Sequence, residues 1–156
     1  MKRLQLRSKE VQDQVEQYNI IITKKDNVEL LEDEQLKLIL LNKEISFFYH
    51  QEKIIPSLQF IVKHPEISTL KKITVDMGAI KHVVSGADIM RPGITHIEEG
   101  IHAQDPVLII DQTHNKPIAV GLALFDSQTM QNLDKGKVIE NIHYIGDKIW
   151  AFKIVK

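Results

Sequence analysis

Short runs of β-branched and aromatic residues, each closed by turn-forming residues, constrain the fold of this chain more than any other feature of its sequence. In the first part of the chain the runs are Ile20–Thr23, Val28–Leu31, Leu36–Leu41 and Glu44–His50. Asn42-Lys43 separates the last two runs, and because Asn tolerates positive φ, we expect a tight hairpin there. The spacing therefore predicts that these strands form a meander.

One helix and one further extended segment are also predicted in this part of the chain. Val11, Val15 and Tyr18 recur at helical spacing and indicate a short amphipathic helix near the start. Ser8 stands at the position of its N-cap. Ser57–His64 lies between two prolines and carries apolar side chains at alternate positions, so we expect it to be extended.

A second structural unit is predicted to begin around Ile73, because a new helix pattern starts just after it. Asp76 can cap this helix, and Gly86 stands where a left-handed residue would end it. The apolar positions that share one face are Met77, Ile80, Val83 and Val84. Arg91-Pro92-Gly93 then fits a type II turn, because Pro presets φ at the second position and Gly supplies positive φ at the third.

Four more strands and another short helix are predicted in the second unit. The strands are expected at Val107–Asp111, Ile118–Phe125, Lys137–Ile145 and Lys148–Val155. Gly121 indicates a bulge or barrel bend, and Asp126 can cap the helix. The last two strands are expected to form a hairpin around Gly146-Asp147. Many short strands, two brief helices and regular turns predict an α+β chain with a small closed or nearly closed barrel.

Composition and spacing argue against metal and cofactor chemistry. The chain has no Cys, which excludes disulfides, thiolate zinc sites, iron-sulfur clusters and a Cys nucleophile. His96 and His102 superficially suggest metal ligands. They lie six residues apart, however, and Gly100 weakens any helix that could align them, so the zincin spacing is absent. We therefore predict no metal site and no cofactor.

Catalytic motifs are also missing from the sequence. Ser85 precedes Gly86, yet Val83 occupies the position where a nucleophile elbow carries its first Gly. Gly78, Gly86 and Gly93 are too widely spaced for a dinucleotide fingerprint or a phosphate-binding loop, because both motifs concentrate glycines around one phosphate. We expect a protein that is not an enzyme.

Charge and hydropathy bear on the location of the protein and on its partners. The net charge of −1 argues against a wholly basic surface but leaves a local basic patch open. Met1–Arg7 is basic and leads into a polar run, where a secretory signal needs apolar residues. No apolar run approaches the roughly 18 residues of a membrane-spanning helix. We expect a cytoplasmic protein without membrane association.

The region around the first helix of the second unit is a candidate site for a phosphate or a nucleotide. Gly78 lies in the first turn, where a bulky ligand can approach the backbone. Lys81 and His82 follow on the next turn, and Arg91 stands at the turn beyond. In the alternative interpretation the glycines only make turns, and Arg91 pairs with Asp88.

Four stretches of the sequence resemble a known family. The second unit resembles the PUA domain, a small pseudo-barrel RNA-binding module, in VDMGAIKHVVSGADIMRPGI (75–94) and PIAVGLALFDS (117–127). More narrowly, the chain is similar to the malignant T-cell amplified sequence family and its archaeal relatives in SFFYHQEKIIPSLQFIVKHPE (46–66) and KGKVIENIHYIGDKIW (135–150).

The resemblance implies an N-terminal α/β pre-PUA domain, residues 1–73, followed by a PUA pseudo-barrel of short mixed strands with two short helices, residues 74–156. It implies non-catalytic RNA binding in translation initiation or ribosome recycling. The RNA would be tRNA, near its exposed 3′ end, or rRNA of the small ribosomal subunit. A partner protein of the density-regulated type, with a SUI1 domain, is also implied. The residues that match the RNA-binding region of PUA domains are Gly78, Ala79, Lys81, Ser85, Gly86, Ala87 and Arg91.

One departure from the family pattern and two alternative functions accompany this resemblance. Many PUA domains carry Gly-Asp ahead of the central strand, whereas this chain has Gln104-Asp105, so we expect that turn to differ. The first alternative is an RNA-targeting accessory subunit of an RNA-modifying enzyme, since PUA domains commonly accompany such enzymes. The second is a protein-protein adaptor, which would lack salt-sensitive RNA affinity.

Overall fold

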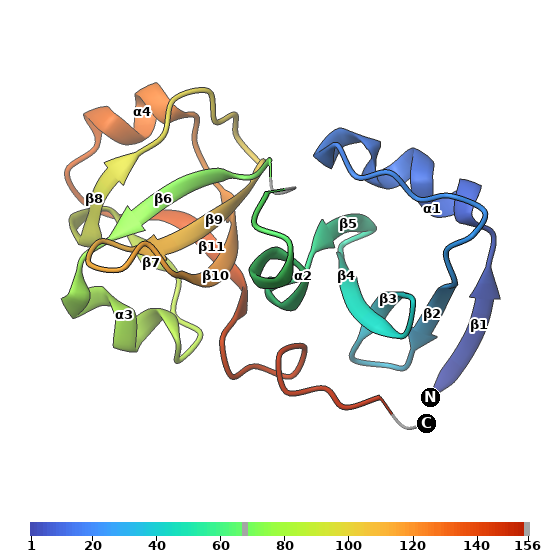
Figure 1. Ribbon diagram of the computed structural model, residues 1–156. Coiled ribbons are helices and arrows are strands. Elements are labelled where there is room, and N and C mark those ends of the chain that lie inside the picture. The colour runs from blue at the N-terminus through green and yellow to red at the C-terminus, as the bar shows by residue number, and fades with distance from the viewer. Residues whose placement is uncertain (67–68, 155–156) are drawn as a thin grey trace. The chain divides into compact units, whose positions relative to one another are not determined.

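The computed structural model describes residues 1–66 and 69–154, and its contacts divide the chain into two compact units (Figure 1). The first unit is Met1–Thr69 together with the chain from Ala151 onward, and the second is Leu70–Trp150. In the part of the chain that is described, no helix is long and apolar enough to span a membrane.

The first unit is built on a five-stranded sheet in which every neighbouring pair is antiparallel and follows the order of the chain. Its strands are β1 (Lys2–Leu6), β2 (Val28–Glu32), β3 (Lys37–Leu41), β4 (Glu44–His50) and β5 (Lys53–Pro56). Its helical segments are α1 (Ser8–Val15), the 3-10 helix η1 (Glu16–Tyr18) and α2 (Leu58–Lys63). The predicted meander is confirmed in β2 to β4, and β1 and β5 extend it on either side.

Local sequence explains the hairpin between β3 and β4 and the position of α1. Asn42 and Lys43 have φ values of 53° and 71°, so both residues adopt the left-handed conformation that a two-residue hairpin turn requires.

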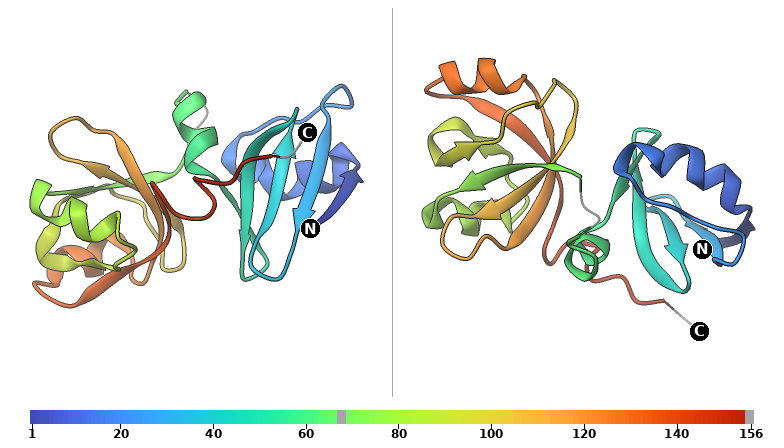
Figure 2. Two further views of the ribbon diagram at one scale, coloured as in Figure 1. Left: turned by 90° about the horizontal axis from the view of Figure 1, so that it is seen from below. Right: turned by 45° about the horizontal axis from the view of Figure 1, so that its top comes forward.

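The two valines of α1 are buried, so the predicted amphipathic helix is confirmed. The helix lies across one face of the sheet (Figure 2). The helix begins after Arg7, whose side chain makes no capping bond, so the predicted N-cap at Ser8 is wrong.

The prediction that Ser57–His64 is extended is wrong, because most of this stretch forms α2. The hydroxyl of Ser57 accepts a hydrogen bond from the N–H of Phe60 at 3.2 Å and so caps the helix. Leu58 and Ile61 are buried at helical spacing. The short apolar pattern suited a strand equally well, and packing of one face against β4 selected the helix.

Two other segments of the first unit differ from the sequence-based expectation. Ile20–Thr23 is not a strand, because it pairs with the side chain of Gln12 rather than with another strand. β1 escapes prediction because its side chains are mostly exposed at the edge of the sheet, so it carries little apolar pattern.

The second unit curls a six-stranded mixed sheet around its own core (Figure 2). Its strands are β6 (Lys71–Val75), β7 (Ile89–Met90), β8 (Ile94–Ile97), β9 (Pro106–Asp111), β10 (Pro117–Ala123) and β11 (Lys137–Tyr144). Its helical segments are α3 (Met77–Val83), the 3-10 turn η2 (Arg91–Gly93) and α4 (Ser127–Asn132). The spatial order is β7-β11-β10-β9-β6-β8, with β6 and β9 parallel and the other pairs antiparallel. The predicted α+β fold class is confirmed.

Aspartate caps begin both α-helices of the second unit, as predicted. Asp76 accepts a hydrogen bond from the N–H of Ala79, and Asp126 accepts one from the N–H of Thr129, each at 2.8 Å. The predicted bulge in β10 is also confirmed, because the register between β10 and β11 shifts at Gly121.

Two turns of the second unit depart from the expected geometry. Arg91-Pro92-Gly93 forms η2 rather than a type II turn, since Gly93 does not adopt positive φ. Gln104 has a φ of 72°, in the region that favours glycine. The turn before β9 thus has a left-handed backbone although Gln stands in it.

The predicted hairpin at the end of the chain is wrong. The carboxylate of Asp147 accepts hydrogen bonds from the N–H groups of Tyr144 and Trp150, so a tight turn follows β11 instead of another strand. Burial raises the pKa of Asp147, but its hydrogen bonds with the buried His143 and with the backbone outweigh burial and lower the pKa below its ordinary value. The end of the predicted strand, Val155, lies outside the described residues.

The predicted domain ranges, 1–73 and 74–156, differ from the two observed units in residues 70–73 and in the residues after Trp150. β6 belongs entirely to the second sheet, although it begins before residue 74. The chain from Ala151 onward groups with the first unit. Pairing of β6 with β8 and β9 therefore sets where the second unit starts.

Candidate functional site

An open groove of about 800 Å³ lies beside α3 in the second unit. Its lining comes from α3, from the chain between α3 and β8, and from the start of β11. The lining side chains and backbone include Gly78, Ala79, His82, Ala87, Met90 and Lys137. Met90 is 50% exposed, so the groove presents a large apolar side chain to solvent.

Two glycines allow close packing beside this groove. A Cβ on Gly93 would lie 3.1 Å from the Cβ of Ala79, so the absence of a side chain lets η2 approach α3 closely. Gly86 has a φ of 94°, and a Cβ there would lie 3.1 Å from the ring of Tyr144. The predicted left-handed residue after α3 is therefore confirmed, and packing against β11 adds a second reason for glycine.

Hydrogen bonds to β11 fix the loop between α3 and β7. Nδ2 of Asn141 donates to the C=O of Val83 at 2.9 Å and to the C=O of Ala87 at 3.0 Å. The N–H of Asn141 donates to the carboxylate of Asp88 at 2.9 Å. Nζ of Lys137 lies 3.4 Å from the other carboxylate oxygen of Asp88. These contacts give one wall of the groove a defined conformation.

His96 and His102, which superficially suggested metal binding, have different surroundings. Among the residues that the structure describes, no group of three His, Asp or Glu side chains is arranged to hold a metal ion. Nδ1 of His102 lies 3.5 Å from the carboxylate of Asp105, and His96 is exposed on β8.

Comparisons with known proteins place the groove in a family context. A model of the PUA domain matches residues 71–145, and a model of a domain of unknown function, DUF1947, matches residues 5–64. The chain is 43% identical over 145 residues to an uncharacterized protein of Methanocaldococcus jannaschii, covering 93% of this chain and 88% of the relative. It is 35% identical over 148 residues to malignant T-cell-amplified sequence 1-B of Xenopus laevis, covering 91% and 81%. The chain belongs to the malignant T-cell-amplified sequence family.

A further relative and a solved structure agree with membership of the malignant T-cell-amplified sequence family. Translation machinery-associated protein 20 of Eremothecium gossypii is 32% identical over 142 residues, covering 86% of this chain and 77% of the relative. A crystal structure of a hypothetical protein from the archaeon Pyrococcus horikoshii has a TM-score of 0.82 and 30% identity, covering 96% of this chain and 98% of that one. The resemblance drawn from the sequence motifs is confirmed.

In this member of the malignant T-cell-amplified sequence family, the predicted site residues fall into two groups. Gly78, Ala79 and Ala87 line the groove. Lys81 is exposed on α3, and its C=O accepts a hydrogen bond from the hydroxyl of Ser85 at 2.7 Å. Neither of these two side chains lines the groove, and Gly86 and Arg91 lie outside it as well.

Arg91 has a structural role that its sequence context does not reveal. Its Nε donates to the C=O of Met130 at 2.8 Å, and its Nη1 donates to the C=O of Ile94 at 3.2 Å. The guanidinium therefore joins α4 to the start of β8. The proposed alternative pairing of Arg91 with Asp88 is wrong, since Asp88 faces Lys137 and the backbone of β11.

Replacing Arg91 by Ala is expected to lower the free energy of unfolding by about 1 to 3 kcal/mol, because two carbonyl groups lose a charged donor. Urea denaturation followed by circular dichroism measures the change. Arg91→Lys should recover only part of the loss, since an ammonium group lacks the fork that reaches both carbonyls. Unchanged stability of Arg91→Ala would contradict the structural role.

Sequence reasoning did not assign most of the groove residues to RNA, among them Met90, His82 and Lys137. Met90 gave no indication, because the sequence does not show which single apolar residues stay exposed. His82 was placed beside Lys81 in the candidate phosphate-binding region but was not among the residues assigned to RNA. Lys137 gave no indication, because its place in the groove depends on pairing of β11 with β7.

Proposed function

We propose that this protein binds RNA in translation, through the groove beside α3, and that it acts in the cytoplasm without catalysis. The observation that carries the proposal is the position of the groove. The groove lies entirely within residues 71–145, the part of the chain that matches the PUA model. The relatives of the chain include a protein named for association with the translation machinery. The RNA is tRNA, near its 3′ end, or rRNA of the small ribosomal subunit.

The chemistry of the groove suits an unpaired nucleotide. Single-stranded RNA is recognised through bases that leave their stack and contact apolar or aromatic surfaces. Met90 and Pro92 offer such a surface, and the small residues Gly78 and Ala79 leave room for the sugar-phosphate backbone next to them. Lys81 is exposed on the same helix and can reach a phosphate.

Replacing Lys81 by Ala is expected to weaken RNA binding by about 1 kcal/mol and to reduce the salt slope by about 1, because one phosphate contact is lost. Fluorescence anisotropy with tRNA, at several salt concentrations, measures both quantities. Lys72→Ala is the matched control, since Lys72 is also exposed in the second unit but lies on β6 away from the groove. If Lys81→Ala binds tRNA and small-subunit rRNA with wild-type affinity and slope, RNA binds elsewhere.

The two alternative functions have distinct outcomes. Cosedimentation of the protein with small ribosomal subunits supports the proposal, whereas copurification of an RNA-modifying enzyme favours an accessory subunit. A tight protein partner without salt-sensitive RNA affinity favours an adaptor. A partner with a SUI1 domain is compatible with the proposed role in initiation or recycling. Cosedimentation with small ribosomal subunits in the presence of such a partner tests this role.

A further inference from the structure

The segment that links η1 to β2 has the hydrogen bonding of a strand without belonging to a sheet. Nε2 of Gln12 donates a hydrogen bond to the C=O of Ile20 at 3.0 Å, and Oε1 of Gln12 accepts one from the N–H of Ile22. In a sheet, a neighbouring strand donates to such a C=O group and accepts from such an N–H group. The Gln12 amide therefore takes the place of a strand partner on one edge of this segment. Burial alternates in the same way: Ile20 and Ile22 are buried, and Ile21 is 82% exposed.

The opposite edge of this segment is open. Successive residues of an extended chain direct their N–H and C=O groups to alternate sides, so those of Ile21 point away from Gln12. Neither group makes a hydrogen bond within the described residues. An open backbone donor and acceptor beside an exposed isoleucine side chain are a template for one more strand.

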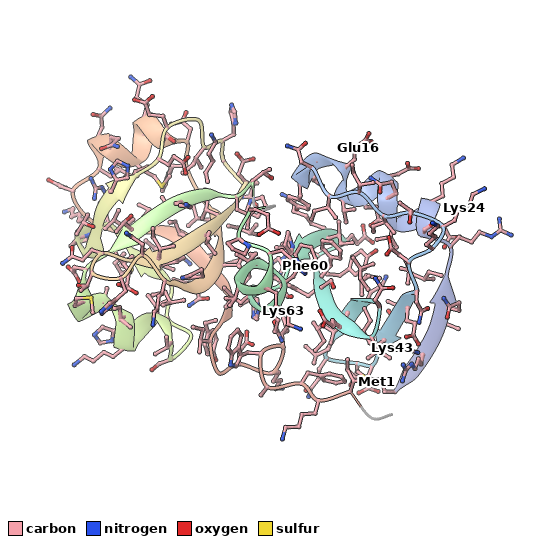
Figure 3. All side chains as sticks on the ribbon, viewed as in Figure 1. Met1, Glu16, Lys24, Lys43, Phe60 and Lys63 are labelled. Carbon is pink, nitrogen blue, oxygen red and sulfur yellow. The ribbon has the colours of Figure 1, made fainter. Side chains whose placement is uncertain are left out.

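A groove of about 490 Å³ lies at this segment of the first unit. It is lined by Asn19, Ile20 and Ile21, by Leu41 and, at α2, by Phe60 and His64, whose ring centroids are 4.8 Å apart. Figure 3 labels Phe60 on α2. An apolar side chain carried by an added strand therefore has an apolar and aromatic surface to bind.

The basic residues next to the groove favour an acidic occupant. Lys24 and Lys25 are exposed directly after Ile20–Thr23, and neither forms an ion pair with a described residue. The turn that carries them is held in place, because the carboxylate of Asp26 accepts a hydrogen bond from the N–H of Thr23 at 2.8 Å. Two adjacent cations on a fixed turn attract a carboxylate-bearing chain.

The acidic residues that line the groove already have partners. Oε1 of Glu44 lies 2.6 Å from Nζ of Lys63. Asp26 accepts a hydrogen bond from Nδ2 of Asn42 at 3.0 Å. The hydrogen bond from the N–H of Thr23 is the main cause that lowers the pKa of Asp26, and the bond from Asn42 lowers it further. Asp26 keeps its negative charge, because both donors are neutral, but among the described residues neither it nor Glu44 forms an ion pair with Lys24 or Lys25.

We propose that this groove binds an extended acidic peptide of a partner protein by strand addition to Ile21. The backbone of Ile21 exchanges hydrogen bonds with the added strand, and an apolar side chain of the peptide enters the groove beside Phe60. Acidic residues of the peptide approach Lys24 and Lys25. This binding is independent of RNA binding by the second unit, so either can fail while the other holds.

The probe for this site is a peptide selected from a random display library on the full chain. The selected sequences are expected to combine apolar residues with Asp or Glu. When such a peptide binds the isotope-labelled chain, exchange of the Ile21 amide hydrogen should slow by about tenfold or more, because the amide becomes hydrogen-bonded. Ile21→Glu should weaken binding by about tenfold, since it removes the apolar contact and adds a repelling charge.

Two controls keep the test specific. Val62→Glu changes another exposed apolar residue of the first unit, outside the groove, and should alter peptide affinity by less than about twofold. Combined Lys24→Glu and Lys25→Glu should abolish the preference for acidic peptides. The proposal is overturned if no peptide is selected, if the selected peptides lack acidic residues, or if exchange at Ile21 is unchanged. Binding of an RNA oligonucleotide in place of a peptide at Ile21 would overturn it as well.

Discussion

A Gly121→Ala variant is expected to lose about 2 to 3 kcal/mol of the free energy of unfolding of the second unit. A Cβ at Gly121 would collide with Cγ2 of Ile139 and would lie 2.8 Å from the backbone oxygen of Glu140, both on the adjacent strand β11. A side chain can change rotamer, but the Glu140 oxygen belongs to the backbone of the sheet. One of the two strands must therefore shift at the bulge, and the hydrogen bonds around it weaken.

Urea denaturation followed by the fluorescence of Trp150, the single tryptophan of the chain, measures this loss in the second unit. Gly78→Ala is the matched control, because a Cβ there would lie 3.4 Å from the Asp76 carboxylate, an ordinary contact. Since Gly78 lies within α3, Ala should stabilise the unit by up to about 1 kcal/mol. Equal stability of Gly121→Ala and the wild type would show that the sheet accommodates the methyl group.

Glu29 is expected to make the first unit sensitive to acid. It is 6% exposed on β2, and its carboxylate lies 2.6 Å from Nε of Arg3 and 3.1 Å from Nζ of Lys43. The hydrogen bond from Arg3, reinforced by Lys43, outweighs burial and lowers the pKa of Glu29 to about 2. The charged carboxylate is therefore favoured in the folded state more than in the unfolded chain.

The sign of the pH effect follows from this lowered pKa. Stability from Glu29 is fully present above the ordinary Glu pKa, roughly 4.5, and is lost as the pH falls toward the folded value, about 2. We expect about 1 to 2 kcal/mol, because the exposed ends of Arg3 and Lys43 weaken the interaction through solvent screening. Urea midpoints of the first unit, measured by circular dichroism between about pH 6 and pH 2, report the loss.

Glu29→Gln removes the titrating group and should flatten this part of the pH profile, while lowering stability near neutral pH. Glu44→Gln is the control, since Glu44 pairs with Lys63 at an exposed site where an ion pair contributes under about 1 kcal/mol. A Glu29→Gln profile that parallels the wild type down to about pH 2 would show that other carboxylates cause the acid loss.

The candidate site was predicted in part from the sequence. Gly78, Ala79 and Ala87 follow from motif resemblance, and all three line the groove beside α3. Arg91 was assigned to RNA from the same resemblance and because it is a cation. Its guanidinium bonds the carbonyl of Met130, 39 residues further along the chain, and no local pattern reports such a contact.

The sequence by itself determined the features that depend on a few adjacent residues. Asp76 and Asp126 cap their helices, Gly86 takes a left-handed backbone, and Asn42-Lys43 makes a hairpin, because each depends on bonds that span at most one turn. Only the tertiary structure decided that Leu58–Lys63 is a helix and that Ile20–Thr23 stays outside the sheet.

The tertiary structure also decided which side chains share the groove. Lys137 reaches it because β11 pairs with β7, and Asn141 holds its wall because Asp88 lies opposite. The physical reason is the range of the forces involved. Caps and turns are selected by local hydrogen bonds, whereas short apolar segments suit helix and strand almost equally. Burial against distant parts of the chain therefore decides their conformation and their neighbours.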